Sequence, residues 1–234
     1  MGGQACVLYG AAQVSKDVDF ILLAQDQNFV RLTAALESLG ARRIAVPRFD
    51  PELLNRGHAV HFRCSAPGVE ELRVDLLTRL RELPGFATLW ERRTVFQDRD
   101  GTEFHLLSVP DLVQAKKTQR SKDWPVIELL VAIHYRENES DPRPAWVTFW
   151  LGEARSAELL LELVRRFPEE ANAMQQNRPP LSQAIQGDLD ALRSALDAEV
   201  RAEQAKDRAY WEPLRREIEA FRREEREGGA GRAG

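Results

Sequence analysis

Hydrophobic and polar residues alternate in several short segments of the first half of the chain, as they do in strands that bury one face. Phe29, Leu32, Leu36 and Leu39 instead recur at helical spacing, which predicts a helix between Asn28 and Gly40. A short helix is expected at 4–12. The predicted strands are 17–24, 43–46, 58–64, 71–78 and a hairpin formed by 94–96 and 103–107. This half therefore predicts a mixed α/β structure.

The second half reads as almost wholly helical. Asp111 is a plausible N-cap for a helix through about Ser121, and Pro125 suits the first turn of the next helix. Residues 137–144 form the clearest linker. Beyond it come a leucine-rich stretch, 149–167, and an apolar stripe over 189–200. The predicted parts are a core at 1–110, helices packed on that core at 111–136, a helical region at 145–227 and a disordered tail at 228–234.

Composition restricts the class of protein without naming it. The 234 residues are 43% hydrophobic and 30% charged, and the net charge is −4, which disfavours a general nucleic-acid binder. No apolar run is long enough to span a membrane, and no secretory signal is recognisable. Cys6 and Cys64 are predicted to be buried thiols rather than a disulfide. A cytoplasmic location without membrane contact is the expectation.

Three aspartates on two of the predicted strands carry the most specific chemistry. Asp17 and Asp19 are two residues apart and therefore share one face of their strand. Asp75 lies far downstream, with Arg73 on the same predicted face. If the two strands are neighbours, the three carboxylates converge, and they cannot all stay ionised without cations. Hard oxygen ligands suit Mg²⁺, and a pair of such ions about 3.5–4 Å apart can assist an in-line phosphoryl displacement.

A glycine pair, Gly2-Gly3, precedes these aspartates by a short spacer. This order resembles the nucleotidyltransferase superfamily that includes DNA polymerase β. The segment YGAAQVSKDVDF looks like its bacterial branch with a "G..R.T.D-h-D" signature, to which minimal, antibiotic-modifying and toxin–antitoxin enzymes belong. The segment VPDLVQAKKTQRSKDWPVIELL looks like the usual sequel in that branch. The resemblance covers about the first half of the chain. It implies a nucleotidyltransferase-like mixed sheet with flanking helices, followed by an all-helical C-terminal region.

Two departures from the family pattern stand out. Gln13 occupies the position of a family arginine, and Ser15 replaces a threonine but keeps a hydroxyl. In the family a hydrophobic strand ends at the glycine pair, whereas here only Met1 precedes it. We expect either a start codon further upstream or the loss of that strand, and favour the first. An upstream stop codon would exclude it.

The resemblance assigns roles to particular residues. Asp17, Asp19 and Asp75 would be catalytic and would bind Mg²⁺, or Mn²⁺, with an NTP as substrate. Asp75 would also be able to accept the proton of the acceptor. Residues Gly2, Gly3 and Ser15 would cradle the β- and γ-phosphates.

One lysine is expected to neutralise charge on the leaving pyrophosphate, and Lys116 is the first candidate. The basic group formed by Lys116, Lys117, Arg120 and Lys122 is otherwise interpreted as a solvated helix face.

The predicted reaction transfers a nucleoside monophosphate from an NTP to an acceptor hydroxyl and releases pyrophosphate. The acceptor is a small molecule such as an aminoglycoside-like or lincosamide-like drug, a tRNA end or a protein side chain. The alternative is a catalytically decayed interaction protein, for example a toxin–antitoxin partner, whose C-terminal helices bind a protein or self-associate. A two-metal nuclease ranks last, because no Glu-x-Lys follows Asp75.

Other candidate motifs have simpler interpretations. His58 and His61 are three apart on a strand, so they face opposite ways and do not form a metal pair. Two distant cysteines and scattered histidines lack the ligand spacing of a zinc site. Trp146 and Trp150 are four apart and are interpreted as core or interface anchors rather than a base-stacking platform.

Overall fold

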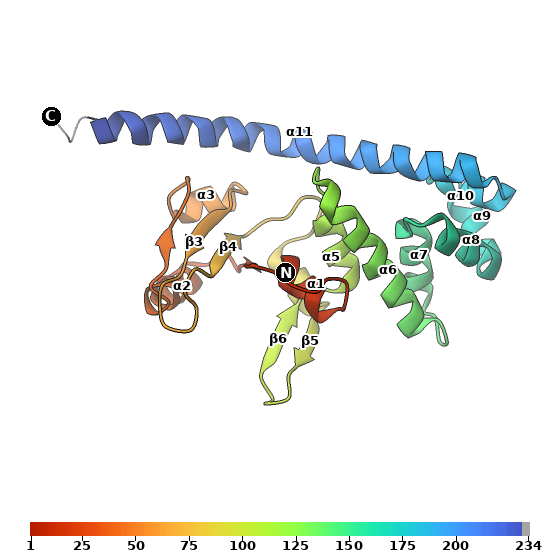
Figure 1. The fold of residues 1–234 in the computed structure, drawn as a ribbon, viewed down its shortest axis with the longest axis horizontal. Helices are drawn as coiled ribbons and strands as arrows, with labels where there is room; N and C mark the ends of the chain where they lie inside the picture. The colour runs from red at the N-terminus through yellow and green to blue at the C-terminus, as the bar shows by residue number, and fades with distance from the viewer. Residues whose placement is uncertain (231–234) are drawn as a thin grey trace. The chain divides into compact units, whose positions relative to one another are not determined.

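The computed structural model describes residues 1–230, with side chains as far as residue 227. The chain forms two compact units. The first contains residues 1–7, 13–108 and the chain from Ala209 onward, and the second contains 8–12 and 109–208. The structure mixes helices with a four-stranded and a two-stranded sheet and ends in a long helical region, as Figure 1 shows. The α/β class predicted from the sequence is confirmed at this level.

The four-stranded sheet of the first unit has the order β1-β4-β3-β2. Strands β1 and β4 are parallel, and β3 and β2 follow in antiparallel fashion. The register of β1 and β4 places Asp19 opposite Asp75 and Asp17 opposite Arg73. The strands are β1 (Asp17–Ile21), β2 (Arg42–Arg43), β3 (Val60–Arg63) and β4 (Arg73–Leu77).

The alternation along β3 and β4 sends apolar side chains to one face of this sheet. Val60, Phe62, Val74 and Leu76 are buried there. Helix α2 (Asp26–Ser38) and the short helix α3 (Pro51–Asn55) cover that face with Phe29, Leu36 and Leu54. The opposite face of β1 and β4 therefore carries the three aspartates.

Several boundaries in the first unit differ from the sequence prediction. The first helix, α1, is Gly2–Leu8 rather than 4–12, so the glycine pair forms its first turn. Helix α2 begins after Gln25 instead of at Asn28, whose side-chain amide donates to the Leu23 carbonyl. Gly40 has a φ of +58° just after α2, as expected of the residue that ends it.

Two short helices and a hairpin complete the first unit. The loop predicted at 47–57 contains α3, where the Asp50 side chain caps the Glu52 N–H. Helix α4 (Phe86–Glu91) was also not predicted, since six residues are too few for a periodic signal. The predicted hairpin is confirmed as β5 (Thr94–Gln97) and β6 (Glu103–Leu106), a separate two-stranded ribbon in Figure 1.

The second unit is helical. Val109 begins its first helix, so Asp111 lies in the first turn rather than at the N-cap, and the helix ends at Lys116 rather than Ser121. The leucine-rich stretch 149–167 is divided between two helices, because the chain turns between Glu153 and Ala157. The elements are α5 (Val109–Lys116), the 3₁₀ turn η1 (Ser121–Asp123), α6 (Trp124–Asn138), α7 (Pro144–Glu153), α8 (Ala157–Arg166), α9 (Pro168–Met174) and α10 (Pro179–Gln186).

The last helix, α11 (Leu189–Ala230), has 42 residues and contributes to both units. In the second unit, Leu192 and Leu196 of the predicted stripe are buried. In the first unit, Glu217 accepts a contact of 2.7 Å from His58 Nε2 and an ion pair from Arg56. The tail predicted at 228–234 is helical as far as Ala230, and residues 231–234 lie outside the described residues.

Two predictions from composition can be compared with the fold. Cys6 and Cys64 are both buried free thiols, which confirms that they do not form a disulfide. Within residues 1–230, no helix combines the length and the apolarity that crossing a bilayer requires.

Trp150 is fully buried in the second unit and donates through Nε1 to His134 Nδ1 at 2.9 Å, which confirms its interpretation as a core residue.

Candidate functional site

The register of the two parallel strands brings the candidate carboxylates together on one face of the sheet. Asp19 and Asp75 are directly opposite each other, and Asp17 is opposite Arg73. Residues at paired positions of a sheet point to the same side, so all four side chains share this face. Asp17 and Asp19 are partly exposed, whereas Asp75 is 8% exposed. The expectation that the two strands are neighbours is therefore confirmed.

Asp75 is held by two basic side chains. Arg73 donates from Nε to Oδ1 at 2.8 Å and from Nη2 to Oδ2 at 2.9 Å. His61, which lies opposite Asp75 on β3, places Nδ1 2.8 Å from Oδ1. Both carboxylate oxygens thus have partners from within the sheet.

These contacts decide the ionisation of Asp75. Burial raises the pKa of the Asp75 carboxyl, but the hydrogen bonds from His61 and Arg73 outweigh it and hold the pKa below its ordinary value. The pKa of Arg73 is raised, first by its hydrogen bond to Asp75 and further by the charges of Asp17 and Asp19. Arg73 therefore serves as a counter-charge for all three aspartates. A carboxylate with a lowered pKa stays ionised at neutral pH, which suits a ligand better than a proton acceptor.

The glycine pair lies directly against this face. Gly2 has a φ of +68°, and a Cβ placed on it would lie 1.8 Å from Asp19 Oδ2. A Cβ on Gly3 would lie 2.2 Å from Ser15 Oγ. Ser15 Oγ in turn donates to the Asp17 carbonyl at 2.9 Å, and the Met1 ammonium donates to the Asp19 carbonyl at 2.8 Å. Only residues without a side chain fit at both positions, so the pair forms a tight cradle around Asp19 and Ser15.

The donor set can be tested against a divalent metal. Within residues 1–227, no three or more His, Cys, Asp or Glu side chains are grouped so as to hold an ion. Both carboxylate oxygens of Asp75 are engaged by Arg73 and His61. The chemistry of the set still fits Mg²⁺, because Asp17 and Asp19 offer carboxylates beside the glycine cradle. Asp75 would join them if Arg73 turned away.

Lys116 lies in the second unit, at the end of α5. Its Nζ donates to Asp123 Oδ1 at 3.3 Å, and Thr118 Oγ1 and Arg120 Nε donate to Oδ2 at 2.6 and 2.9 Å. Burial raises the pKa of the Asp123 carboxyl, but the Thr118 hydroxyl and the charges of Lys116 and Arg120 hold it below its ordinary value. The helix face interpreted as solvated instead has two of its cations gathered around a buried carboxylate.

Sequence reasoning overlooked two residues of the candidate site. Arg73 was placed on the face of Asp75 but was given no role, and His61 was regarded as an ordinary strand residue. The alternation of β4 was enough to pair Arg73 with Asp75, since residues i and i+2 share a face. His61 could not be found in that way, because its position depends on the register between β3 and β4. Comparison with known proteins adds nothing here, since no protein-family model, curated protein or solved structure matches the chain.

Proposed function

We propose that this protein is a Mg²⁺-dependent nucleotidyltransferase with a nucleotidyltransferase-like fold in its first unit. It would transfer a nucleoside monophosphate from an NTP to an acceptor hydroxyl and release pyrophosphate. The observation that carries the proposal is the joint placement of Asp17, Asp19 and Asp75 on one sheet face, with Gly2 packed against Asp19. Carboxylates beside a side-chain-free cradle are the elements that a metal–triphosphate site needs.

The residues have distinct roles in this proposal. Asp17 and Asp19 hold the ions together with Asp75, and Mg²⁺ bound there supplies positive charge to the phosphate oxygens. Gly2 and Gly3 allow the backbone to approach the triphosphate closely, and Ser15 fixes the turn that leads into β1. Asp75 acts as a ligand, because its pKa lies below the ordinary value. Arg73 supplies the counter-charge of Asp75 until a cation replaces it.

The test is a thermal shift with each of the four NTPs, with and without Mg²⁺. A ligand that binds only the folded state raises Tm by mass action. At a concentration of 100 times Kd it increases the free energy of unfolding by about 2.7 kcal/mol. We expect a Mg²⁺-dependent rise for at least one NTP. We expect Asp17→Asn with Asp19→Asn to abolish this rise.

A matched control uses two carboxylates of the hairpin, Asp100→Asn with Glu103→Gln. Both residues are exposed and lie outside the carboxylate face. This variant removes the same number of charges and should keep the full shift. A shift that survives in the Asp17/Asp19 variant, or that disappears equally in the control, would contradict the proposed site.

A second candidate function is an interaction protein on a decayed nucleotidyltransferase scaffold. The ion pair of Asp75 with Arg73 favours it, because a carboxylate that already has a partner does not require a metal. Under this proposal no NTP raises Tm with or without Mg²⁺, and the protein instead associates with itself or with another protein through its C-terminal helices. Sedimentation over a range of concentrations detects self-association.

A further inference from the structure

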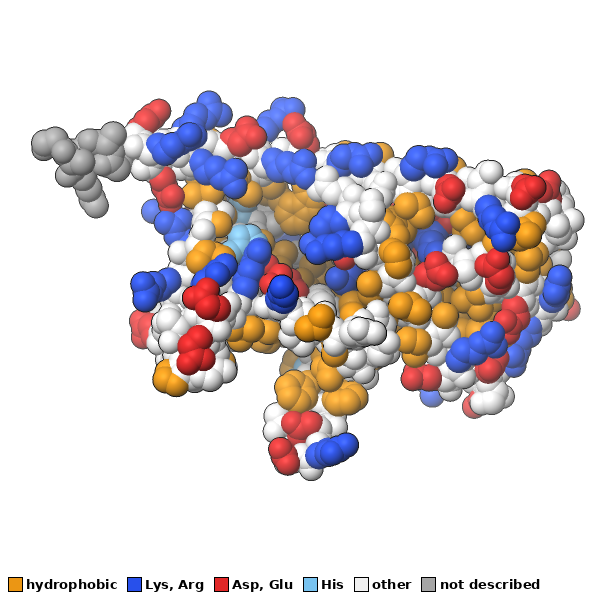
Figure 2. All heavy atoms as spheres, viewed as in Figure 1, with side chains coloured by type: hydrophobic (Ala, Val, Ile, Leu, Met, Phe, Trp, Pro, Cys, Tyr) orange, Lys and Arg blue, Asp and Glu red, His pale blue; other side chains and the backbone are white. Residues whose placement is uncertain are grey.

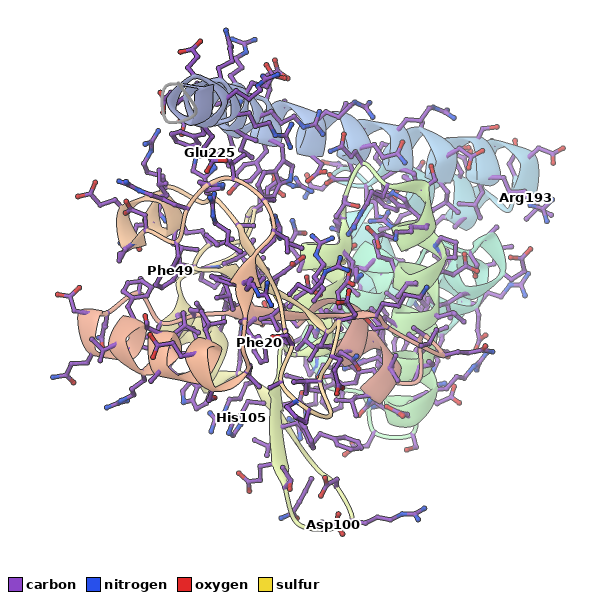
Figure 3. All side chains as sticks on the ribbon, turned by 60° about the vertical axis from the view of Figure 1, so that its left-hand side comes forward. Phe20, Phe49, Asp100, His105, Arg193 and Glu225 are labelled. Carbon is purple, nitrogen blue, oxygen red and sulfur yellow. The ribbon has the colours of Figure 1, made fainter. Side chains whose placement is uncertain are left out.

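A hollow of about 70 Å³ lies in the first unit and is lined by the end of β1, helix α4 and the end of β6. Its wall contains four rings and a guanidinium, and Met1, Ile21 and three leucines complete it. Figure 3 labels two of its residues, Phe20 on β1 and His105 on β6, as well as Asp100 at the tip of the hairpin. The principal lining residues are Met1, Phe20, Phe86, Trp90, Arg93 and His105.

The rings of this wall are held by one another. Phe86 and Trp90 stack with centroids 5.6 Å apart and planes 18° from parallel. Arg93 lies over the Trp90 ring at 4.1 Å, and its Nε donates to His105 Nδ1 at 3.2 Å. The centroid of His105 is 4.6 Å from that of Trp90. The wall is therefore a fixed aromatic surface with a cation attached to it.

This surface is turned to water rather than buried. Phe20 is 47% exposed and Trp90 is 41% exposed, although both are large apolar side chains. Figure 2 shows hydrophobic side chains gathered on the hairpin, with charged ones at its tip. Exposed clusters of large apolar side chains commonly mark binding sites. Its small volume suits a single planar ring system better than a helix or a folded partner.

The hollow adjoins the candidate carboxylates along the chain. Ile21 lines the hollow and lies two residues after Asp19 on β1, so the two side chains share a face of the sheet. Met1 lines the hollow, and its neighbour Gly2 packs against Asp19 Oδ2. A molecule whose phosphates lie at the glycine cradle would thus have its next part beside the aromatic wall.

We propose that this hollow binds the nucleobase of the NTP. The inference rests on the proposed function, because it takes the glycine cradle as the triphosphate site. A base presents a planar π-face, which stacks on aromatic side chains regardless of its identity. Its edge presents carbonyl and ring-nitrogen acceptors, which an arginine can donate to. Arg93 thus supplies the polar contact and the rings supply the stacking.

The experiment measures binding of the four NTPs and of inorganic tripolyphosphate by calorimetry, in the presence of Mg²⁺, to the full chain. Wild type is compared with Trp90→Ala and with Phe104→Ala. Phe104 is the control because it is 41% exposed on the same hairpin but does not line the hollow. Phe20→Ala provides a second variant at an exposed position, should Trp90→Ala fail to fold.

We expect at least one NTP to bind wild type and Phe104→Ala more tightly than tripolyphosphate does. Trp90→Ala and Phe20→Ala should weaken the binding of that NTP by roughly 5- to 150-fold, the range expected for one base–aromatic stack. The affinity for tripolyphosphate should stay unchanged in both variants. NTP affinities equal to wild type in both variants would overturn the inference.

A separate measurement distinguishes failure of the hollow from failure of the cradle. Nucleosides lack phosphate, so the part of their quenching of tryptophan fluorescence that is lost when Trp90 is replaced reports on the hollow without the cradle. We expect quenching in wild type and a smaller amplitude in Trp90→Phe. If tripolyphosphate does not bind but this quenching occurs, the glycine cradle is not a phosphate site, whereas the hollow still binds a base. If quenching occurs while NTPs bind no better than tripolyphosphate, the base belongs to another molecule and the assignment to the NTP is wrong.

Discussion

Replacement of Gly2 by alanine gives the sharpest test of the cradle. The new Cβ would lie 1.8 Å from Asp19 Oδ2 and 2.8 Å from Asp19 Cβ. An ordinary van der Waals contact begins near 3.4 Å, so the carboxylate must move by about 1.6 Å, or the N-terminal turn must move away. A displacement of about 1 Å in a catalytic group can cost on the order of 100-fold in rate. We expect Gly2→Ala to weaken Mg²⁺-dependent NTP binding by at least about tenfold.

The backbone effect of this replacement must be separated from the clash. Gly2 has a φ of +68°, where a residue with a side chain is strained by about 1–2 kcal/mol. Gly68 is a matched control, because its φ is +86° and a Cβ there would meet nothing within 4 Å. Chemical denaturation measures the strain in both variants, and calorimetry measures NTP binding. The reasoning is refuted if Gly2→Ala binds NTP as well as Gly68→Ala does.

Three further predictions concern stability. Asp123→Asn should cost about 1.5–3 kcal/mol at pH 7. The pKa of Asp123 is lower in the folded state than in the unfolded state. Its carboxylate therefore adds to the free energy of unfolding at pH values above the unfolded-state pKa of about 3.9, and this stabilisation is lost as the pH falls through the folded-state pKa. The difference in free energy of unfolding between wild type and Asp123→Asn, measured by denaturation, should therefore become smaller below about pH 4. A difference that stays constant from pH 7 to pH 3 would contradict this. Arg178→Met should lower the free energy of unfolding by about 3–5 kcal/mol, because Arg178 is buried and donates to Glu199 and to two backbone carbonyls, those of Leu151 and Ala154. The control is Arg193→Met, at an exposed arginine, which should give no measurable change in Tm. Arg73→Met should lower the free energy of unfolding by about 1–3 kcal/mol, because it removes the hydrogen bonds to Asp75. Millimolar Mg²⁺ should stabilise this variant more than it stabilises wild type. Equal stabilisation of the two proteins would show that Arg73 does not compete with a cation.

The sequence was sufficient for the elements whose pattern repeats over many residues. The spacing of Phe29, Leu32, Leu36 and Leu39 located α2, and the turn before Thr102 located the hairpin. The two carboxylate strands were also found, because Asp19 and Asp75 each lie between two apolar residues. Their adjacency needed the assumption that the strands pair, which the register confirms.

The sequence was insufficient where a contact joins distant segments. His61 meets Asp75 only through the pairing of β3 with β4, and Lys116 meets Asp123 only because the chain turns after α5. Helices α3 and α4 are five and six residues long, which is less than two turns. Such short helices are set by a cap such as Asp50 and by their tertiary contacts rather than by periodicity.

The pairing of Asp75 with Arg73 and His61 bears on the order in which the protein is assembled in a cell. A cluster of carboxylates without counter-charges resists compaction, so such a domain often needs its metal in order to fold. Here the counter-charge is encoded in the same sheet as Arg73, two residues from Asp75 on β4, and His61, directly across on β3, adds a hydrogen-bond partner. The sheet can therefore reach its native form on an ion-free chain soon after synthesis. Under the proposed function, Mg²⁺ binding would therefore follow folding and would not be required for it.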